Sequence, residues 1–337
     1  MYGKKTLLFL GEKGFSGALI RRELSDQANV LSPELFRDRS LAEQLVANSP
    51  ALKPGDLVFN ALGPFTDSYL PVLEFCLARG LHYFDICGEW QVFEAMQQWG
   101  ARAVEAGCMI LPGIGFDVVA SDCLVGHVHR RLPDASRLQI GIAGLGLISR
   151  GSARTLRSLV GEPLRQRRRG RLVLEPRIRE ERFDFGQGEC RALGVSWGDI
   201  STAWHSTRVP NIEVFFQATP ALSAAVFANR TFGWLVAGNG GETFSDAILN
   251  SLPKGPSDTS RADKKSALIV RASNGDGVTV ASRLQTPEAY TFTAHAAAAT
   301  LEHFLRNGVQ PGFQTPSTAL GPDFPLALPD CERQDVL

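Results

Sequence analysis

The sequence lacks the features that would assign it at once to a nucleic-acid-binding or membrane protein. Its 337 residues carry 35 Lys plus Arg and 35 Asp plus Glu, so no cationic excess favours a polyanionic partner or a membrane surface. No run of about 18 apolar residues is uninterrupted, which argues against a membrane span. The N-terminus has no small-residue cleavage site, so we expect no signal peptide.

The six cysteines form no C-x-x-C pair, and no group of histidines and cysteines has metal-ligand spacing. The closest histidines, His127 and His129, lie in a helix-like stretch where positions i and i+2 diverge. We therefore expect reduced thiols, a cytoplasmic location and no metal site.

The first positive feature is a glycine-rich turn. A mostly apolar run over Lys5–Leu10 leads into Gly11-Glu12-Lys13-Gly14-Phe15-Ser16-Gly17, and a helix-prone stretch follows. A dinucleotide-binding unit begins in this order, because glycines let the backbone approach a pyrophosphate at the helix N-terminus. The spacing G-x-x-G-x-x-G also fits a tight strand-to-helix turn that binds nothing, and the turn alone leaves both interpretations open.

Strand-like and helix-like segments then alternate. Apolar runs end at Gly63-Pro64-Phe65, at Cys87-Gly88-Glu89 and at Gly113–Asp117, with helical patterns between them. This order predicts a Rossmann-type parallel sheet over residues 1–118, with the three loops together at the carboxyl ends of its strands.

The pattern changes in residues 119–337, for which we predict an antiparallel α+β substrate or dimerisation domain. Ser266–Ser273 and Val278–Thr286 flank Asn274-Gly275-Asp276-Gly277, which predicts a β-hairpin. A helix to about Arg306 follows, with the Thr286 hydroxyl as the expected cap. The C-terminal residues are free to pack back on the first domain.

Taken together, these stretches resemble the saccharopine dehydrogenase-like reductases, including the trans-acting enoyl reductases. The resemblance runs almost the whole length of the chain. It is carried by the Gly11–Gly17 turn, Asn60–Phe65, Tyr83–Glu89, Pro112–Asp117 with Ser121-Asp122, Gly151-Ser152-Ala153, and Pro311–Phe324.

The resemblance implies reduction by NADP or NAD of an imine or conjugated alkene, in a small or carrier-bound biosynthetic intermediate. We expect a homodimer. The residues expected to hold the cofactor are Gly11, Gly14, Phe15, Ser16, Gly17, Arg37, Asn60, Gly63, Pro64 and Phe65.

Two departures weaken the cofactor assignment. Glu12 and Lys13 replace the small residues usual in the family's turn, and a carboxylate facing the pyrophosphate would oppose binding. Only 38 residues separate Gly17 from Asp56, which predicts that one βα unit, the one that binds the adenine ribose, is lost or shortened. Glu34 is the nearest acid for a ribose, whereas Arg37 or Arg39 would suit a 2′-phosphate.

Glu89, Asp117 and Tyr83 are the candidate proton donors, with Asp85 beside them. A carboxyl group partly desolvated beside a nicotinamide can act as a general acid. Glu89 and Asp117 can instead be helix N-terminal carboxylates that accept backbone N–H groups, and Tyr83 a core aromatic. Cys87 is a further candidate, as a nucleophile.

Positive charge gathers between Arg150 and Arg171, where eight arginines face one acid, Glu162. This stretch is either a solvated loop or a docking surface for an acidic carrier protein or a coenzyme A thioester. Two alternatives to the reductase stay open as well. One is a cofactor-free acid–base enzyme, a cyclase or isomerase, on a degenerate scaffold; the other is a non-catalytic ligand-binding protein.

Overall fold

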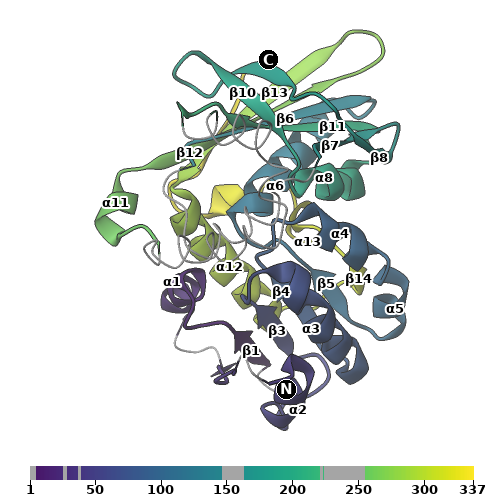
Figure 1. Cartoon of the computed structure of the whole chain (residues 1–337), viewed down its shortest axis with the longest axis vertical. Coiled ribbons are helices and arrows are strands. Elements are labelled where there is room, and N and C mark those ends of the chain that lie inside the picture. Colours follow the sequence, from purple (N-terminus) through teal and green to yellow (C-terminus); the bar gives the residue numbers. More distant parts are fainter. Residues whose placement is uncertain (1–4, 26–28, 37–38, 146–162, 221–222, 224–254) are drawn as a thin grey trace, which may run out of the picture.

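The computed structural model describes residues 5–25, 29–36, 39–145, 163–220, 223 and 255–337. Two sheets lie one beyond the other along the long axis of the molecule, with helices between and around them (Figure 1). In the part of the chain that is described, no helix combines the length and the apolar character needed to cross a membrane.

The first sheet has six strands, all paired in parallel, in the order β14-β5-β4-β3-β1-β2. Its central strands are apolar and fully buried, as expected for a parallel sheet covered on both faces. The strands are β1 (Thr6–Leu10), β2 (Asn29–Leu31), β3 (Leu57–Asn60), β4 (His82–Asp85), β5 (Met109–Leu111) and β14 (Gly312–Phe313).

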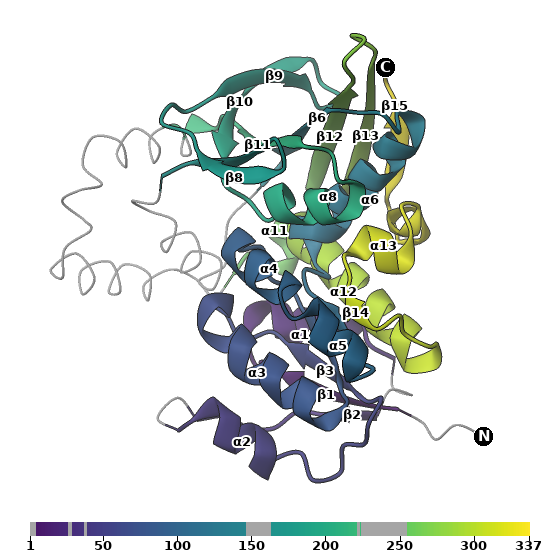
Figure 2. The same ribbon diagram turned by 90° about the vertical axis from the view of Figure 1, so that its right-hand side faces the viewer.

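Helices from both ends of the chain cover this sheet. On one face lie α1 (Phe15–Glu23) and α12 (Ala289–Arg306), whose apolar side chains share a core with Leu7 and Phe9. The opposite face, near the viewer in Figure 2, carries α2 (Leu41–Ala47), α3 (Phe65–Arg79), α4 (Trp90–Gln97) and α5 (Gly100–Glu105). Strand β14 and helix α12 thus bring C-terminal residues onto the N-terminal sheet.

The shortening of the Rossmann unit falls at a different place from the one predicted. Strand β2 is present and pairs with β1, and α2 then leads directly to β3 on the other side of β1. In the described chain no strand lies beyond β2, so the sheet ends there. The strand that precedes Glu34 is therefore retained, and the missing piece is the outer strand, because a helix as short as α2 returns the chain at once to the centre of the sheet.

The second sheet is mixed, which corrects the prediction of an antiparallel domain. Its order is β15-β13-β12-β6-β11-β10-β9, with β7 pairing to β11 and β8, and β6 and β11 run parallel. The chain passes through β7–β10 and α8 before β11, so β11 enters from the same end as β6. The bounds are β6 (Arg137–Ala143), β7 (Arg165–Arg168), β8 (Arg171–Leu174), β9 (Glu180–Asp184), β10 (Glu189–Val195), β11 (Asn211–Gln217), β12 (Lys265–Ser273), β13 (Thr279–Pro287) and β15 (Glu332–Asp335).

Helices α6 (Phe116–Arg131) and α8 (Asp199–Thr207) share a core with this sheet and extend toward the first. The remaining short elements are α11 (Asp258–Ala262), α13 (Pro316–Leu320) and the 3-10 turn Phe324–Ala327. The predicted hairpin is confirmed as β12 and β13. The cap of α12 is the Glu288 carboxylate, which accepts from the N–H groups of Tyr290 and Thr291, and not the Thr286 hydroxyl, which donates to the Pro287 carbonyl.

Candidate functional site

Asp85, the last residue of β4, joins the loops at the carboxyl ends of the strands. Its Oδ1 accepts from the N–H groups of Cys87, at 2.9 Å, and Gly113, at 2.8 Å. Its Oδ2 accepts from the Tyr83 hydroxyl at 2.7 Å. Complete burial raises the pKa of Asp85 to about 7, although these three hydrogen bonds favour the charged form. Asp85 therefore fixes loop geometry from inside the protein.

Tyr83 and Asn60 belong to the same buried network. Both are fully buried. The Asn60 amide donates to Ser68 Oγ at 3.1 Å and to the Tyr83 hydroxyl at 3.4 Å, and its oxygen accepts from Leu62 N at 3.0 Å. Burial raises the pKa of Tyr83 well above its usual value. These side chains hold the loop after β3 and have no exposed group to offer a ligand.

The Glu89 carboxylate is anchored by backbone N–H groups of two separate segments. Its Oε1 accepts from Phe65 N, the first residue of α3, at 3.2 Å, and its Oε2 accepts from Gly88 N at 3.0 Å. The Cys87 thiol also donates to Oε2, at 3.1 Å. Burial and the charge of Glu89 raise the pKa of Cys87 well above its usual value, so Cys87 stays a neutral thiol and lacks the thiolate that a nucleophile needs. The Glu89 carboxylate thus accepts one N–H at the start of α3 and one from the loop before α4, and it does not cap α4.

Asp117 presents its carboxyl group where the two halves of the molecule meet. It lies in the first turn of α6 and, among the described residues, no hydrogen bond ties its carboxyl oxygens. Burial, and then the charge of Glu89, raise the pKa of Asp117 to about 7. A Cβ built on Gly88 would be 3.1 Å from Asp117 Oδ2 and 3.3 Å from Trp197 Cζ2. The glycine therefore lets Asp117 and Trp197, which lies between β10 and α8, converge on the loop that carries Glu89.

The glycine-rich turn has the shape that a pyrophosphate requires. Gly11 has a φ of 86°, and a Cβ there would be 2.7 Å from the Ala61 carbonyl oxygen. A Cβ on Gly17 would be 2.2 Å from the Gly11 oxygen, so the helix packs on the turn only with glycine at this position. Gly14 caps α1 without a side chain, and no acid lies in the first turn of the helix. The N-terminus of α1 is thus suited to an anion.

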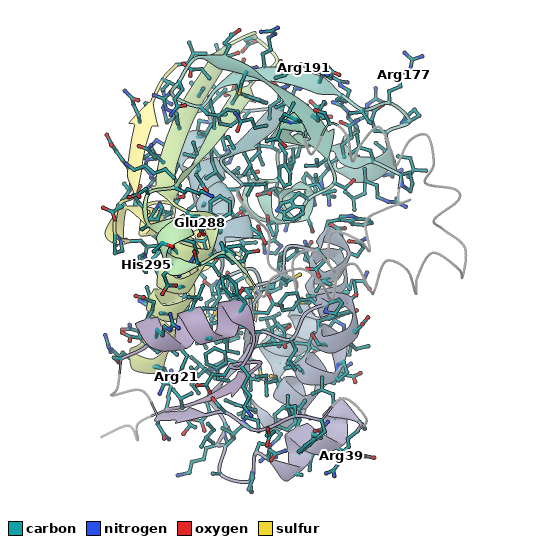
Figure 3. All side chains as sticks on the ribbon, turned by 60° about the vertical axis from the view of Figure 1, so that its left-hand side comes forward. Arg21, Arg39, Arg177, Arg191, Glu288 and His295 are labelled. Atoms are coloured by element: carbon teal, nitrogen blue, oxygen red, sulfur yellow. The ribbon has the colours of Figure 1, made fainter. Side chains whose placement is uncertain are left out.

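Glu12 and Lys13, the two residues unusual for this turn, each form an ion pair. Glu12 lies 3.6 Å from Arg21 Nε, one of the guanidinium nitrogens on α1, and Lys13 Nζ lies 2.7 Å from Glu34 Oε1. Glu34 follows β2, where an acid in this fold meets a ribose. Arg37 lies outside the described residues. Arg39 stacks over the Phe36 ring, 4.9 Å from its centre, at the α2 end of the molecule, away from Arg21 on α1 (Figure 3).

The other residues expected at the cofactor pack mainly on protein. The Phe15 ring meets Tyr290 edge-on at 5.1 Å, and Phe65 is buried as the first residue of α3. Ser16 is half-buried at the second position of α1, Pro64 caps α3, and a Cβ on Gly63 would meet nothing closer than 3.8 Å. The loop at Gly63 is therefore the open part of this edge.

The arginines between Arg150 and Arg171 do not form one exposed surface in the described part of the chain. Arg150, Arg154 and Arg157 lie outside the described residues. Arg165–Arg168 form β7, where Arg167 is 3% exposed, pairs with Glu94 of α4 and donates to the carbonyls of Ile200, at 2.7 Å, and Gly170, at 2.9 Å. Arg165 stacks over Trp90. These arginines clamp α4 to the second sheet, and exposed charge is left at Arg169 and Arg171.

Sequence reasoning missed a buried carboxyl group, Asp199, the first residue of α8. It is fully buried, and its charge is opposed by those of Asp122 and Asp117. In the sequence it reads as an ordinary acid at a helix N-terminus, and nothing there indicates that it faces α6. A separate cavity of about 420 Å³ lies on the nine-stranded sheet, and none of its lining residues belongs to the strand-end site.

Comparison with known proteins gives relatives of one kind. A saccharopine dehydrogenase-like oxidoreductase of Mus musculus is 32% identical over 113 residues, 33% of this chain and 25% of that protein. A trans-acting enoyl reductase of Mycobacterium ulcerans is 30% identical over 148 residues, 37% of this chain and 35% of that protein. The matches thus span about a quarter to a third of these relatives. No protein-family model matches the chain.

The whole fold has a counterpart in a solved structure. Apo saccharopine dehydrogenase (L-Glu forming) from Saccharomyces cerevisiae superposes with a TM-score of 0.58 at 11% identity, over 99% of this chain and 100% of that one. At this identity the match shows the fold alone. The resemblance predicted from the sequence is confirmed: this chain is similar in sequence to saccharopine dehydrogenase-like oxidoreductases and trans-acting enoyl reductases, and it has the saccharopine dehydrogenase fold.

Proposed function

We propose that this protein is an NAD(P)H-dependent reductase in which Asp117 delivers a proton to the substrate. One observation carries the proposal: a glycine cradle and a carboxyl group with a pKa of about 7 lie at the carboxyl edge of the same parallel sheet. Ligands of open α/β sheets bind at this edge. The sequence relatives, named as oxidoreductases and reductases, support the same chemistry.

The residues of the turn fit a dinucleotide. Gly11, Gly14 and Gly17 would hold the pyrophosphate at the N-terminus of α1, and Glu34 would take the adenine ribose. The loops at Gly63 and Gly113 would hold the nicotinamide, which supplies the hydride. Because Glu12 forms an ion pair with Arg21, its carboxylate does not have to face the phosphates.

The charges of the site favour an imine over a conjugated alkene. Glu89 and Asp117 are carboxyl groups, and an imine gains positive charge when it is protonated, which carboxylates stabilise. Reduction of a conjugated alkene builds negative charge on a carbonyl oxygen, which the same groups oppose. The relatives named trans-acting enoyl reductases keep the alkene, in a carrier-bound substrate, as a second candidate.

Glu89 has a supporting role in this proposal. Its oxygens are held by Phe65 N, Gly88 N and the Cys87 thiol, and its charge contributes to the raised pKa of Asp117. Asp117 is thereby a carboxylic acid in a useful fraction of molecules at neutral pH. Tyr83 is left out as a proton donor because it is fully buried and donates to Asp85.

Calorimetric titration with NADPH and NADH tests the cofactor, and loss of reduced-cofactor absorbance tests reduction of 1-pyrroline or a crotonyl thioester. We expect micromolar binding and oxidation with the imine. Reaction with the thioester alone would move the assignment to the enoyl class. No binding up to millimolar cofactor would overturn the reductase and leave acid–base chemistry or ligand binding without turnover. The homodimer and the cytoplasmic location are proposed with it, and sedimentation tests the first.

A further inference from the structure

The segment Trp197–Asp199, between β10 and α8, lies against the proposed proton donor. A Cβ on Gly198 would be 3.0 Å from the Gly88 carbonyl oxygen and 2.6 Å from the Phe93 ring. Glycine at position 198 therefore lets the backbone before α8 pack on the loop that carries Glu89. The Trp197 ring and Asp117 Oδ2 both lie close to Gly88, at 3.3 Å and 3.1 Å from the position of a Cβ there.

Both polar side chains of this segment are unpartnered. Asp199 is fully buried, and within the described part of the chain neither of its oxygens has a hydrogen-bond partner. The nearby Ser121 hydroxyl favours the charged form of Asp199 but donates to the Val118 carbonyl at 3.2 Å. Trp197 Nε1 is also buried, and no described residue accepts its hydrogen. Cζ2 is joined to the indole nitrogen through Cε2 and lies on the same edge of the ring, so the edge that bears the N–H faces Gly88. Buried polar groups rarely stay unpaired, so two on one segment require an explanation.

Burial and the neighbouring carboxyl groups favour the neutral form of Asp199. Asp117 and Asp122 face it from α6, Glu94 belongs to α4, Glu89 directly precedes α4, and Arg167 of β7 is occupied by Glu94 and two backbone carbonyls. Burial, and then the charges of Asp122 and Asp117, raise the pKa of Asp199 to about 8. Asp199 therefore carries a proton at neutral pH, and it offers an O–H donor just as Trp197 offers an N–H donor.

We propose that Trp197 and Asp199 are positioning residues for proton delivery, whose unpaired N–H and O–H groups bind the carboxylate that forms on Asp117 as its proton passes to the substrate. The inference rests on the proposed function. The Asp117 O–H bond breaks, its electron pair stays on the carboxylate, the proton joins the substrate nitrogen, and water returns a proton to Asp117 before the next turnover. Interactions made only as charge develops lower the barrier, whereas interactions already made in the resting state do not.

Three variants distinguish hydrogen-bond donation by Trp197 and Asp199 from a role in packing alone. Trp197→Phe keeps a ring and removes the N–H, Asp199→Leu fills the buried space and removes the O–H, and Asp199→Asn keeps a donor that cannot ionise. Carboxyl ¹³C NMR of aspartate-labelled protein without cofactor reads the pKa of Asp117, assigned with Asp117→Asn. We expect the pKa of Asp117 to rise by about one unit in Trp197→Phe and in Asp199→Leu, and to rise much less in Asp199→Asn.

Reduction of 1-pyrroline gives the second readout. We expect kcat to fall about tenfold in Trp197→Phe and Asp199→Leu with KM within twofold, and Asn at position 199 to recover most of the loss. Trp204→Phe is the matched control, because Trp204 packs on Gly170 and under Arg167, away from Gly88; it should leave the pKa of Asp117 unchanged.

The two readouts keep the two proposals apart. An unchanged Asp117 pKa in both Trp197→Phe and Asp199→Leu overturns the inference, even in an active reductase. An ionised Asp199 at pH 7 overturns it as well. A wild-type protein that binds neither cofactor overturns the proposed function, and the role in delivery to a substrate falls with it, while the NMR titration still decides whether the two donors bind the Asp117 carboxylate.

Discussion

Lys13 Nζ lies 2.7 Å from Glu34 Oε1, so one ion pair joins the glycine-rich turn after β1 to the loop after β2. Both side chains are mostly exposed, at 84% and 65%, and are free to rearrange around a ligand. The contact lies where the adenine ribose of a dinucleotide would be held. A ribose diol would find a carboxylate acceptor there, and a 2′-phosphate would find an ammonium group beside a repelling carboxylate.

This pair predicts the preference between the two cofactors. We expect Glu34→Gln to tighten NADPH about tenfold relative to NADH, because Lys13 is then free for the 2′-phosphate. Adding Lys13→Ala to Glu34→Gln should remove the gain. Calorimetry with both cofactors measures the cycle, and equal ratios in all variants would show that the adenine ribose is held elsewhere.

The raised pKa of Asp117 predicts the pH dependence of reduction. A general acid must be protonated, so kcat should be highest below about pH 7 and decline as pH rises through the pKa. Asp117→Asn should lower kcat about a hundredfold and abolish this limb, with cofactor affinity unchanged. A pH–rate profile of the wild type and the variant tests this prediction. If kcat of the variant still declined as pH rose through about 7, another group would be the proton donor.

The same carboxyl groups predict how stability changes with pH. Asp85, Asp117 and Asp199 have folded-state pKa values raised to between about 7 and about 8, well above the usual value of 3.8. Their protonated forms therefore stabilise the fold fully below about pH 4, and this contribution is lost as pH rises to about 8. Asp199→Leu should raise the free energy of unfolding more at pH 8 than at pH 5. Urea titrations at both pH values measure the difference, and equal gains would mean that Asp199 is already charged at pH 5.

Gly88 is predicted to be a geometric requirement of the site. Gly88→Ala places a Cβ 3.1 Å from Asp117 Oδ2 and 3.3 Å from the Trp197 ring, so both must shift by a few tenths of an ångström. We expect kcat to fall about tenfold while the protein stays folded. Gly275→Ala is the control, because nothing lies within 4 Å of a Cβ there. Equal kcat in the two variants would show that the reaction does not need glycine at position 88.

The buried arginine of β7 is predicted to stabilise the fold and not to dock a partner. Arg167→Met should cost about 2–3 kcal/mol, because it leaves Glu94 without its ion-pair partner. Arg169→Ser and Arg171→Ser, at exposed positions, should change stability by less than about 0.5 kcal/mol. If a carrier protein docks on this surface, these two variants weaken its binding in a salt-dependent way, which fluorescence anisotropy with a labelled acidic carrier measures.

Most of the first sheet and the position of its binding edge follow from the sequence. Alternating apolar strands and helices require a parallel sheet, and the loops that end in Gly63, Gly88 and Gly115 must then share its carboxyl edge. The hairpin at Asn274 is also local, because its turn chemistry fixes the pairing. These features depend on neighbours in the chain, which a sequence displays directly.

The roles of individual site residues were decided by contacts between distant segments. Glu89 and Asp117 look alike in the sequence. Only folding gives Glu89 the N–H groups of Phe65 and Gly88, whereas no described residue donates to the Asp117 carboxyl group. Asp199 looks like a helix cap until α8 packs on α6 and buries it beside two other carboxyl groups. Charge, burial and hydrogen bonding are set by what lies across the interface between the two sheets. Sequence therefore determined the scaffold and its binding edge, and tertiary packing determined which carboxyl group can hold a proton there.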